Sequence, residues 1–179
     1  LFLSGCVSSA LYHPMRSVKY TPADASLSYE DVSIEVSQDI KISGWWIPAA
    51  KASATVLFCH GNGGNISTCL DTAIIINSID LNLLVFDYQG YGTSQGSPSE
   101  QATYQDAEAA LRYLVNTRKI PREQIILWGR SLGGPIAART AAVHPGGPVI
   151  LESTFTSLKD FVHERMSWVP ARSRSRPTS

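Results

Sequence analysis

The sequence predicts an α/β fold with a mostly parallel sheet, on three observations. Residues 54–59 and 81–86 are apolar runs, as expected of strands that are buried on both faces. Segments with helical spacing follow these runs, so strands and helices alternate along the chain. The 179 residues contain no internal repeat and no linker, and their number fits one domain. Parallel strands need crossover helices of this kind.

The N-terminal part departs from this alternation. Residues 7–28 contain proline-based breakers and predict an irregular lead-in. Residues 31–36 alternate apolar and polar side chains, which predicts a half-buried strand, and residues 40–47 have the composition of a second strand. We expect the two strands to form an antiparallel hairpin at an edge of the sheet.

The remaining segments complete the expected order of elements. Further strands are expected at 125–128 and 148–151. Helices are expected at 66–78, 100–117, 134–143 and 157–168, and residues 170–179 have no apolar pattern. The predicted domains are therefore a lead-in at 1–28, a partial α/β domain at 29–168 and a disordered tail at 169–179.

Composition excludes several classes of protein. Apolar residues make up 44% of the chain and charged residues 17%, as in an ordinary globular core. Fifteen basic and fifteen acidic residues cancel, so the charge balance does not favour a nucleic-acid partner. The three cysteines and four histidines are scattered and match no spacing of a metal site, and we expect neither a metal nor another cofactor.

The stretch 124–135 has the clearest chemical meaning. It places G-x-S-x-G, residues 129–133, directly after an apolar strand and directly before a helix, the arrangement of a nucleophile elbow. The tight turn presents the hydroxyl of Ser131, and glycines on either side avoid collisions with the neighbouring strand and helix. The N–H of Leu132 then points to where an oxyanion would form. The five residues alone also occur by chance, and their context favours the elbow.

Two more loops follow predicted strands, at 60–65 and 87–96, and meet the elbow at the same edge of the sheet. The first can supply a second oxyanion donor, the backbone N–H of Asn62. Its other interpretation, a phosphate-binding loop, fails because the glycines do not complete a nucleotide-binding pattern. Asp87 has two interpretations, a residue that holds its turn by accepting amide hydrogen bonds and a catalytic acid, and the first is favoured.

Together these stretches resemble one branch of the α/β-hydrolase superfamily, the Bem46-like serine hydrolases, which are close to the serine aminopeptidases. The matching stretches keep the order of that family and span residues 12–168: Tyr12–Pro14, His60–Asn65, Asp87–Ser94, Gly129–Gly134 and Glu152–Ser157. The resemblance implies hydrolysis of an acyl ester, thioester or amide by a Ser131 nucleophile. It also implies an oxyanion hole from the amides of Leu132 and Asn62, and a structural role for His60.

The chain differs from this family after the elbow, where the resemblance implies an acid and then a histidine. His144 falls at the end of the elbow helix, and His163 pairs at helical spacing with Asp160, away from Ser131. Glu152 ends a strand and is interpreted as structural rather than as the acid. The expectation is a serine hydrolase that lacks its last strands and helix, and with them its general base. The alternative is an inactive fragment or a binding scaffold.

The two ends of the sequence carry further hypotheses. Residues 3–6 resemble a bacterial lipobox, in which Cys6 would carry lipid and anchor the protein at the cell envelope. The alternative is a short apolar start to a cytoplasmic domain. The repetitive stretch 171–177 is interpreted as a frameshifted end, or else as a solvated basic tail. The oligomeric state and the acyl substrate, a small molecule or a peptide, stay open. Arg130 is expected to be a surface or salt-bridge residue rather than a ligand of a substrate carboxylate.

Overall fold

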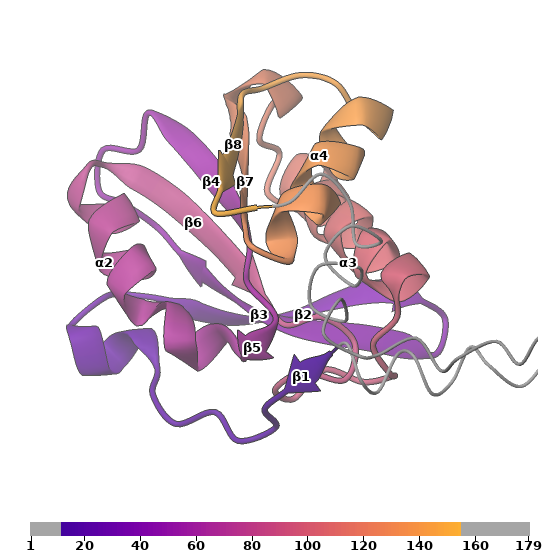
Figure 1. Ribbon diagram of the computed structural model, residues 1–179. Helices are drawn as coiled ribbons and strands as arrows, with labels where there is room; N and C mark the ends of the chain where they lie inside the picture. Colours follow the sequence, from indigo (N-terminus) through magenta and orange to yellow (C-terminus); the bar gives the residue numbers. More distant parts are fainter. Residues whose placement is uncertain (1–11, 155–179) are drawn as a thin grey trace, which may run out of the picture.

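The fold is a twisted mixed sheet between two layers of helices, seen in a computed structural model that describes residues 12–154 (Figure 1). Six strands pair in the order β2-β3-β6-β4-β7-β8. Their bounds are β2 Glu30–Ser37, β3 Ile40–Ile47, β4 Ala54–Cys59, β6 Leu81–Phe86, β7 Ile125–Arg130 and β8 Val149–Glu152. The last four strands pair in parallel, while β2 and β3 form an antiparallel hairpin at the edge. The predicted fold class and hairpin are confirmed.

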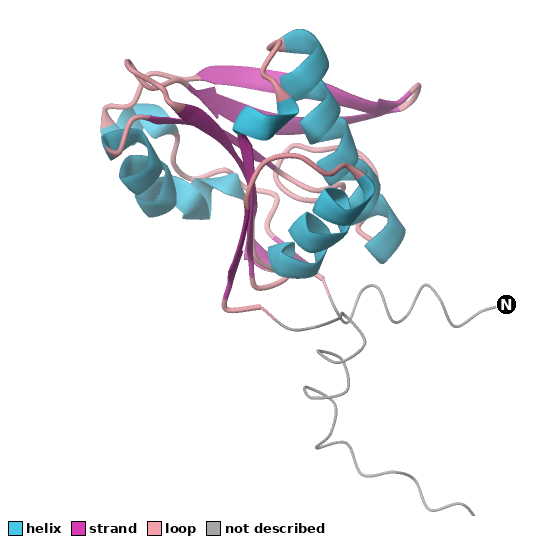
Figure 2. Cartoon of the chain, turned by 90° about the horizontal axis from the view of Figure 1, so that it is seen from above, coloured by secondary structure: helices cyan, strands magenta, loops and turns pink. Residues whose placement is uncertain are grey.

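Helices cover both faces of this sheet (Figures 1 and 2). One face carries α2 (Leu70–Ser78), which follows the short 3₁₀ turn η2 (Ile66–Cys69). The other face carries α3 (Glu100–Arg112) and α4 (Gly133–Val143). The last five residues of the helix expected at 100–117 form a π-helical turn, η3 (Tyr113–Thr117). Two further 3₁₀ turns lie in connections, η1 (Pro22–Ala25) and η4 (Arg122–Gln124).

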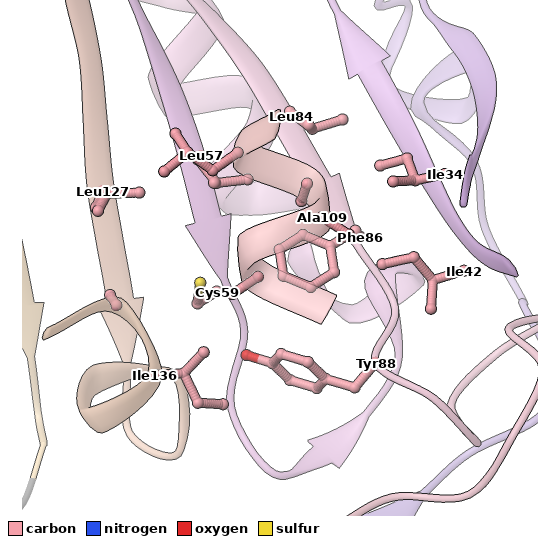
Figure 3. Close-up of a cluster of buried hydrophobic side chains, with 14 of the residues drawn as sticks. Ile34, Ile42, Leu57, Cys59, Leu84, Phe86, Tyr88, Ala109, Leu127 and Ile136 are labelled. Atoms are coloured by element: carbon pink, nitrogen blue, oxygen red, sulfur yellow. The ribbon is translucent and has the colours of Figure 1, made fainter. Parts of the chain in front are cut away.

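The alternation of side chains along the central strand β4 divides the core in two. Val56 and Phe58 pack toward α2, whereas Leu57 and Cys59 pack toward α3 and α4. Figure 3 shows the second cluster, in which Leu57 and Cys59 lie near side chains of the neighbouring strands. Because both faces of β4 are covered, a continuous apolar run is what its position requires.

Part of the lead-in forms regular structure, where the sequence predicted an irregular segment. The short strand β1 (His13–Pro14) pairs in parallel with β5 (Gly63–Gly64) in the loop after β4. The side chain of Asn65 adds two hydrogen bonds, from its Nδ2 to the backbone oxygens of Met15 at 3.0 Å and Ser17 at 2.8 Å. A two-residue strand has too few side chains to show a periodicity, so pattern analysis misses it.

The sheet ends on β8 in the part of the chain that the structure describes. Its three apolar side chains, Val149, Ile150 and Leu151, are 41%, 41% and 50% exposed. Of the helices within residues 12–154, none has the length and apolarity that a membrane span requires. Cys6, the helix expected at 157–168 with Asp160 and His163, and the tail lie outside the described residues.

Candidate active site

Ser131 occupies a strained turn between β7 and α4. Its backbone has φ of 53°, in the left-handed region that non-glycine residues rarely adopt. The N–H of Ser131 donates to the backbone oxygen of Glu152 at 2.9 Å, and its carbonyl oxygen accepts the N–H of Gly134 at 3.0 Å. Such strain persists where surrounding contacts hold it, and it is the geometry expected of a nucleophile elbow.

Close backbone packing explains the glycines around the turn. A Cβ atom on Gly133 would overlap the carbonyl group of Cys59 at the end of β4. A Cβ atom on Gly129 would overlap the backbone of Gly133 itself. The start of α4 therefore lies directly against the end of β4, and this contact needs residues without side chains.

The loop after β4 reaches the elbow. An ideal Cβ atom on Gly61 would lie 3.7 Å from the Cβ atom of Ser131. Asn62, the next residue, has its side-chain oxygen Oδ1 held by two donors, the backbone N–H of His13 at 3.0 Å and the hydroxyl of Tyr91 at 2.9 Å. Leu132 follows Ser131 and is buried at the start of α4. Leu132 thus follows the serine directly, and Asn62 follows the residue that borders it.

His60 and Asp87 form a buried pair beneath this loop. Nε2 of His60 lies 3.5 Å from Oδ1 of Asp87, at the outer limit of a hydrogen bond. Burial lowers the pKa of His60 to about 4 and raises the pKa of Asp87 to about 7. Burial thus disfavours the charged form of each side chain, which favours a neutral contact over an ion pair.

Asp87 connects two loops through its other contacts. Its Oδ1 accepts the backbone N–H of Ile66 at 2.9 Å, at the start of the 3₁₀ turn after the loop 60–65. Its own backbone oxygen accepts the hydroxyl of Ser94 at 2.8 Å. The expected role for Asp87 in accepting amide hydrogen bonds is observed, although the amide belongs to the neighbouring loop.

The surroundings of His60 are those of a structural residue. The imidazole is fully buried and its ring centroid lies 4.5 Å from that of Tyr88. Nδ1 lies 2.7 Å from the backbone oxygen of Gly61, and the backbone oxygen of His60 accepts the hydroxyl of Tyr88 at 2.9 Å. Figure 3 shows the Tyr88 hydroxyl directed toward the chain after Cys59. Both ring nitrogens therefore face groups other than Ser131.

The carboxylate of Glu152 binds side chains at the end of β7, directly before Ser131. Its Oε2 accepts hydrogen bonds from Nε1 of Trp128 at 3.0 Å and from Nε of Arg130 at 2.9 Å. The same guanidinium donates to the hydroxyl of Thr72 at 2.9 Å and lies 5.2 Å from the ring centroid of Phe58. Arg130 thus forms the expected salt bridge, and Glu152 is engaged as its partner.

The described histidines do not supply a base for Ser131. His144 ends α4, a helix of 11 residues, and is therefore about 16 Å along the helix from its start beside Ser131. The backbone oxygen of His144 accepts Nε of Arg122 at 3.0 Å. Within residues 12–154, none of the three histidines contacts Ser131, and no cluster of side chains there is suited to hold a metal ion.

Three contacts of the site were not foreseen in the sequence. They are the hydrogen bond from Tyr91 to Asn62, that from His13 to Asn62, and that from the hydroxyl of Thr154 to the backbone oxygen of Ser131 at 3.1 Å. Each joins segments that are far apart in the chain. The sequence signal is only that these residues lie in the stretches that resemble the hydrolase branch.

Comparison with known proteins supports the resemblance. A family model described as the alpha/beta hydrolase fold matches residues 54–174. The alpha/beta hydrolase domain-containing protein WAV2 of Arabidopsis thaliana is 37% identical over 151 residues, which are 81% of this chain and 49% of that protein. The protein bem46 of Schizosaccharomyces pombe is 30% identical over 148 residues, 79% of this chain and 50% of that protein.

A solved structure agrees with these relatives. The esterase Pf2001 of Pyrococcus furiosus superposes with a TM-score of 0.74 at 26% identity, over 88% of this chain and 61% of that chain. The chain spans about half the length of the curated relatives it matches. Residues 54–174, which the family model matches, contain the elbow and the loops 60–65 and 87–96.

Proposed function

Because the chain belongs to the α/β-hydrolase family, we propose that it is a serine hydrolase whose nucleophile is Ser131. The observation that carries this proposal is the left-handed backbone of Ser131, with φ of 53°, at the junction of β7 and α4. A left-handed serine between a parallel strand inside the sheet and the start of a helix is costly to maintain, and this is the geometry of a nucleophile elbow.

In the proposed reaction the hydroxyl oxygen of Ser131 attacks an acyl carbonyl carbon. The negative charge that develops on the carbonyl oxygen is stabilised by two backbone N–H groups, those of Leu132 and Asn62. Transfer of the hydroxyl proton needs a general base, and none of the three histidines within residues 12–154 contacts Ser131 to supply it. Collapse of the tetrahedral intermediate breaks the bond to the alcohol, thiol or amine, which leaves with the proton taken from the serine. Water then hydrolyses the acyl-enzyme, which releases the carboxylic acid and regenerates the serine.

The substrate class is an acyl compound with a carbonyl that can lose an alcohol, thiol or amine. The similarity to a protein named an esterase favours an ester over a thioester or an amide. We infer no metal or cofactor step, because serine acyl transfer with an oxyanion hole needs neither.

Labelling with a fluorophosphonate tests the proposal. The reagent phosphonylates an activated serine, so we expect wild type to be labelled and Ser131→Ala to be unlabelled. Ser97→Ala, at an exposed loop serine, is the matched control and should label like wild type. Equal labelling of wild type and Ser131→Ala, or no labelling of either, would show that the chain is not an active hydrolase and would favour a binding scaffold.

A further inference from the structure

We propose that Tyr91 and the side chain of Asn62 form a clamp that aims the backbone N–H of Asn62 at the oxyanion. Tyr91 is then a positioning residue for the reaction, and this inference rests on the proposed function. The hydroxyl of Tyr91 donates to Oδ1 of Asn62 at 2.9 Å, and the backbone N–H of His13 donates to the same atom at 3.0 Å. A carbonyl oxygen has two lone pairs, so this oxygen accepts from both donors at once.

The backbone on the far side of Asn62 is held as well. Gly63 and Gly64 pair in register with His13 and Pro14, and the N–H of Met15 donates to the backbone oxygen of Gly64 at 2.9 Å. A loop with so many glycines loses much conformational entropy when it is ordered. These contacts offset the entropy cost of ordering the loop. They hold the backbone of Asn62 in place both through its side chain and through the residues that follow it.

Tyr91 is held by close packing, which suits it to be the fixed end of the clamp. It is fully buried, and its ring lies 5.5 Å from that of His60 and 5.7 Å from that of Tyr88, measured between centroids. Its backbone N–H donates to the backbone oxygen of Tyr88 at 2.9 Å. Burial raises the pKa of Tyr91, so the phenol keeps the proton that it donates to Asn62.

The position of the clamp links it to the chemistry rather than to folding alone. Gly61, which precedes Asn62, is the residue of this loop that borders Ser131, at 3.7 Å between the two Cβ positions. An oxyanion donor works only when its N–H lies about 2.7–3.1 Å from the charged oxygen. A rotation of the peptide between Gly61 and Asn62 would break that distance while leaving the fold intact.

The test compares Tyr91→Phe with Tyr104→Phe in two measurements. Tyr91→Phe removes only the hydroxyl that binds Asn62, whereas Tyr104→Phe removes a hydroxyl that donates to the exposed Glu100 at 2.8 Å. The first measurement is the rate at which a fluorophosphonate labels Ser131, because the phosphonyl oxygen occupies the oxyanion hole. We expect labelling to be about tenfold slower in Tyr91→Phe, because a displaced oxyanion donor stabilises the transition state less well. Labelling of Tyr104→Phe should not change. With an ester substrate, kcat of Tyr91→Phe should be lower than that of wild type, and KM should be unchanged.

The second measurement is amide hydrogen exchange in the segment 61–64, which needs no activity. We expect faster exchange in Tyr91→Phe and in Asn62→Ala than in wild type. Unchanged exchange in both variants overturns the clamp, whether or not wild type is labelled. Faster exchange with an unchanged labelling rate overturns its role in positioning the donor. Absence of wild-type labelling overturns the proposed function, and the catalytic role of the clamp with it.

Discussion

The backbone oxygen of Glu152 accepts the N–H of Ser131 at 2.9 Å, while the Glu152 carboxylate binds the side chain of Arg130, the residue before the serine. The end of β8 therefore holds the elbow through both its main chain and a side chain. In this arrangement the Glu152 carboxylate stabilises the turn at Ser131. A catalytic acid would instead have to orient a histidine, and the contacts of Glu152 leave it bound to Arg130 and Trp128.

Glu152→Gln should therefore have little effect on the reaction. The Arg130–Glu152 pair is partly exposed, so its loss should lower the free energy of unfolding by about 0.5–1 kcal/mol in a denaturant titration. The fluorophosphonate labelling rate of Ser131 should stay within about twofold of wild type, since only a carboxylate that orients the base produces rate losses of about 10⁴ when changed to an amide. Glu30→Gln, which weakens the ion pair with Arg118, is the control. A loss of several orders of magnitude would make Glu152 the catalytic acid.

Thr154→Val tests the second support of the elbow. The hydroxyl of Thr154 donates to the backbone oxygen of Ser131 at 3.1 Å, and valine keeps the shape without the donor. We expect a loss of about 1 kcal/mol in the free energy of unfolding, together with slower labelling of Ser131. Thr140→Val removes a similar hydrogen bond, to the backbone oxygen of Ile136 at 2.8 Å inside α4. It should cost a similar free energy and leave labelling unchanged. Equal labelling of both variants would refute a role for Thr154 at the elbow.

The sequence was informative where one segment carries its own signal. The bounds of β4 and β6 followed from apolar runs, because strands buried on both faces tolerate few polar side chains. The elbow at Ser131 was predicted from the glycines on either side of it, which are needed because the backbones pack too closely for a side chain. Contacts between distant segments have no such signal. The clamp on Asn62 needs Tyr91, 29 positions further along the chain, and only the fold brings them together.

The close approach of α4 to β4 predicts a large difference between two glycine substitutions. Gly133→Ala places a methyl group against the carbonyl of Cys59 and should lower the free energy of unfolding by at least about 2 kcal/mol. Gly63→Ala places its methyl group where no atom lies within 4 Å, so the free energy of unfolding should change by less than about 0.5 kcal/mol. Chemical denaturation of the two variants measures both values. Similar stabilities would contradict the packing of the elbow against the end of β4.

The buried carboxyl of Asp87 predicts a pH dependence of stability. Burial raises its pKa from 3.8 to about 7, so the folded state favours the protonated form. The stabilisation that Asp87 gives to the folded state is therefore fully present below pH 3.8, and it is lost as the pH rises toward 7. A shift of about 3 pKa units corresponds to at most about 4 kcal/mol. Asp87→Asn cannot ionise and keeps an acceptor for the N–H of Ile66. It should match wild type near pH 4 and become the more stable protein by pH 7.

The pH dependence of His60 does not disturb this comparison. Burial lowers its pKa from 6.5 to about 4, so its contribution is present above pH 6.5 and is lost as the pH falls through 4. His60 takes up its proton near pH 4, where the folded state keeps Asp87 protonated and thus as uncharged as an asparagine, so its contribution is nearly the same in wild type and in Asp87→Asn. The opposite outcome, a difference that grows in favour of wild type toward pH 7, would mean that Asp87 is ionised and paired with a protonated His60. The neutral contact inferred at 3.5 Å would then be wrong, and His60 would carry charge beneath the oxyanion loop.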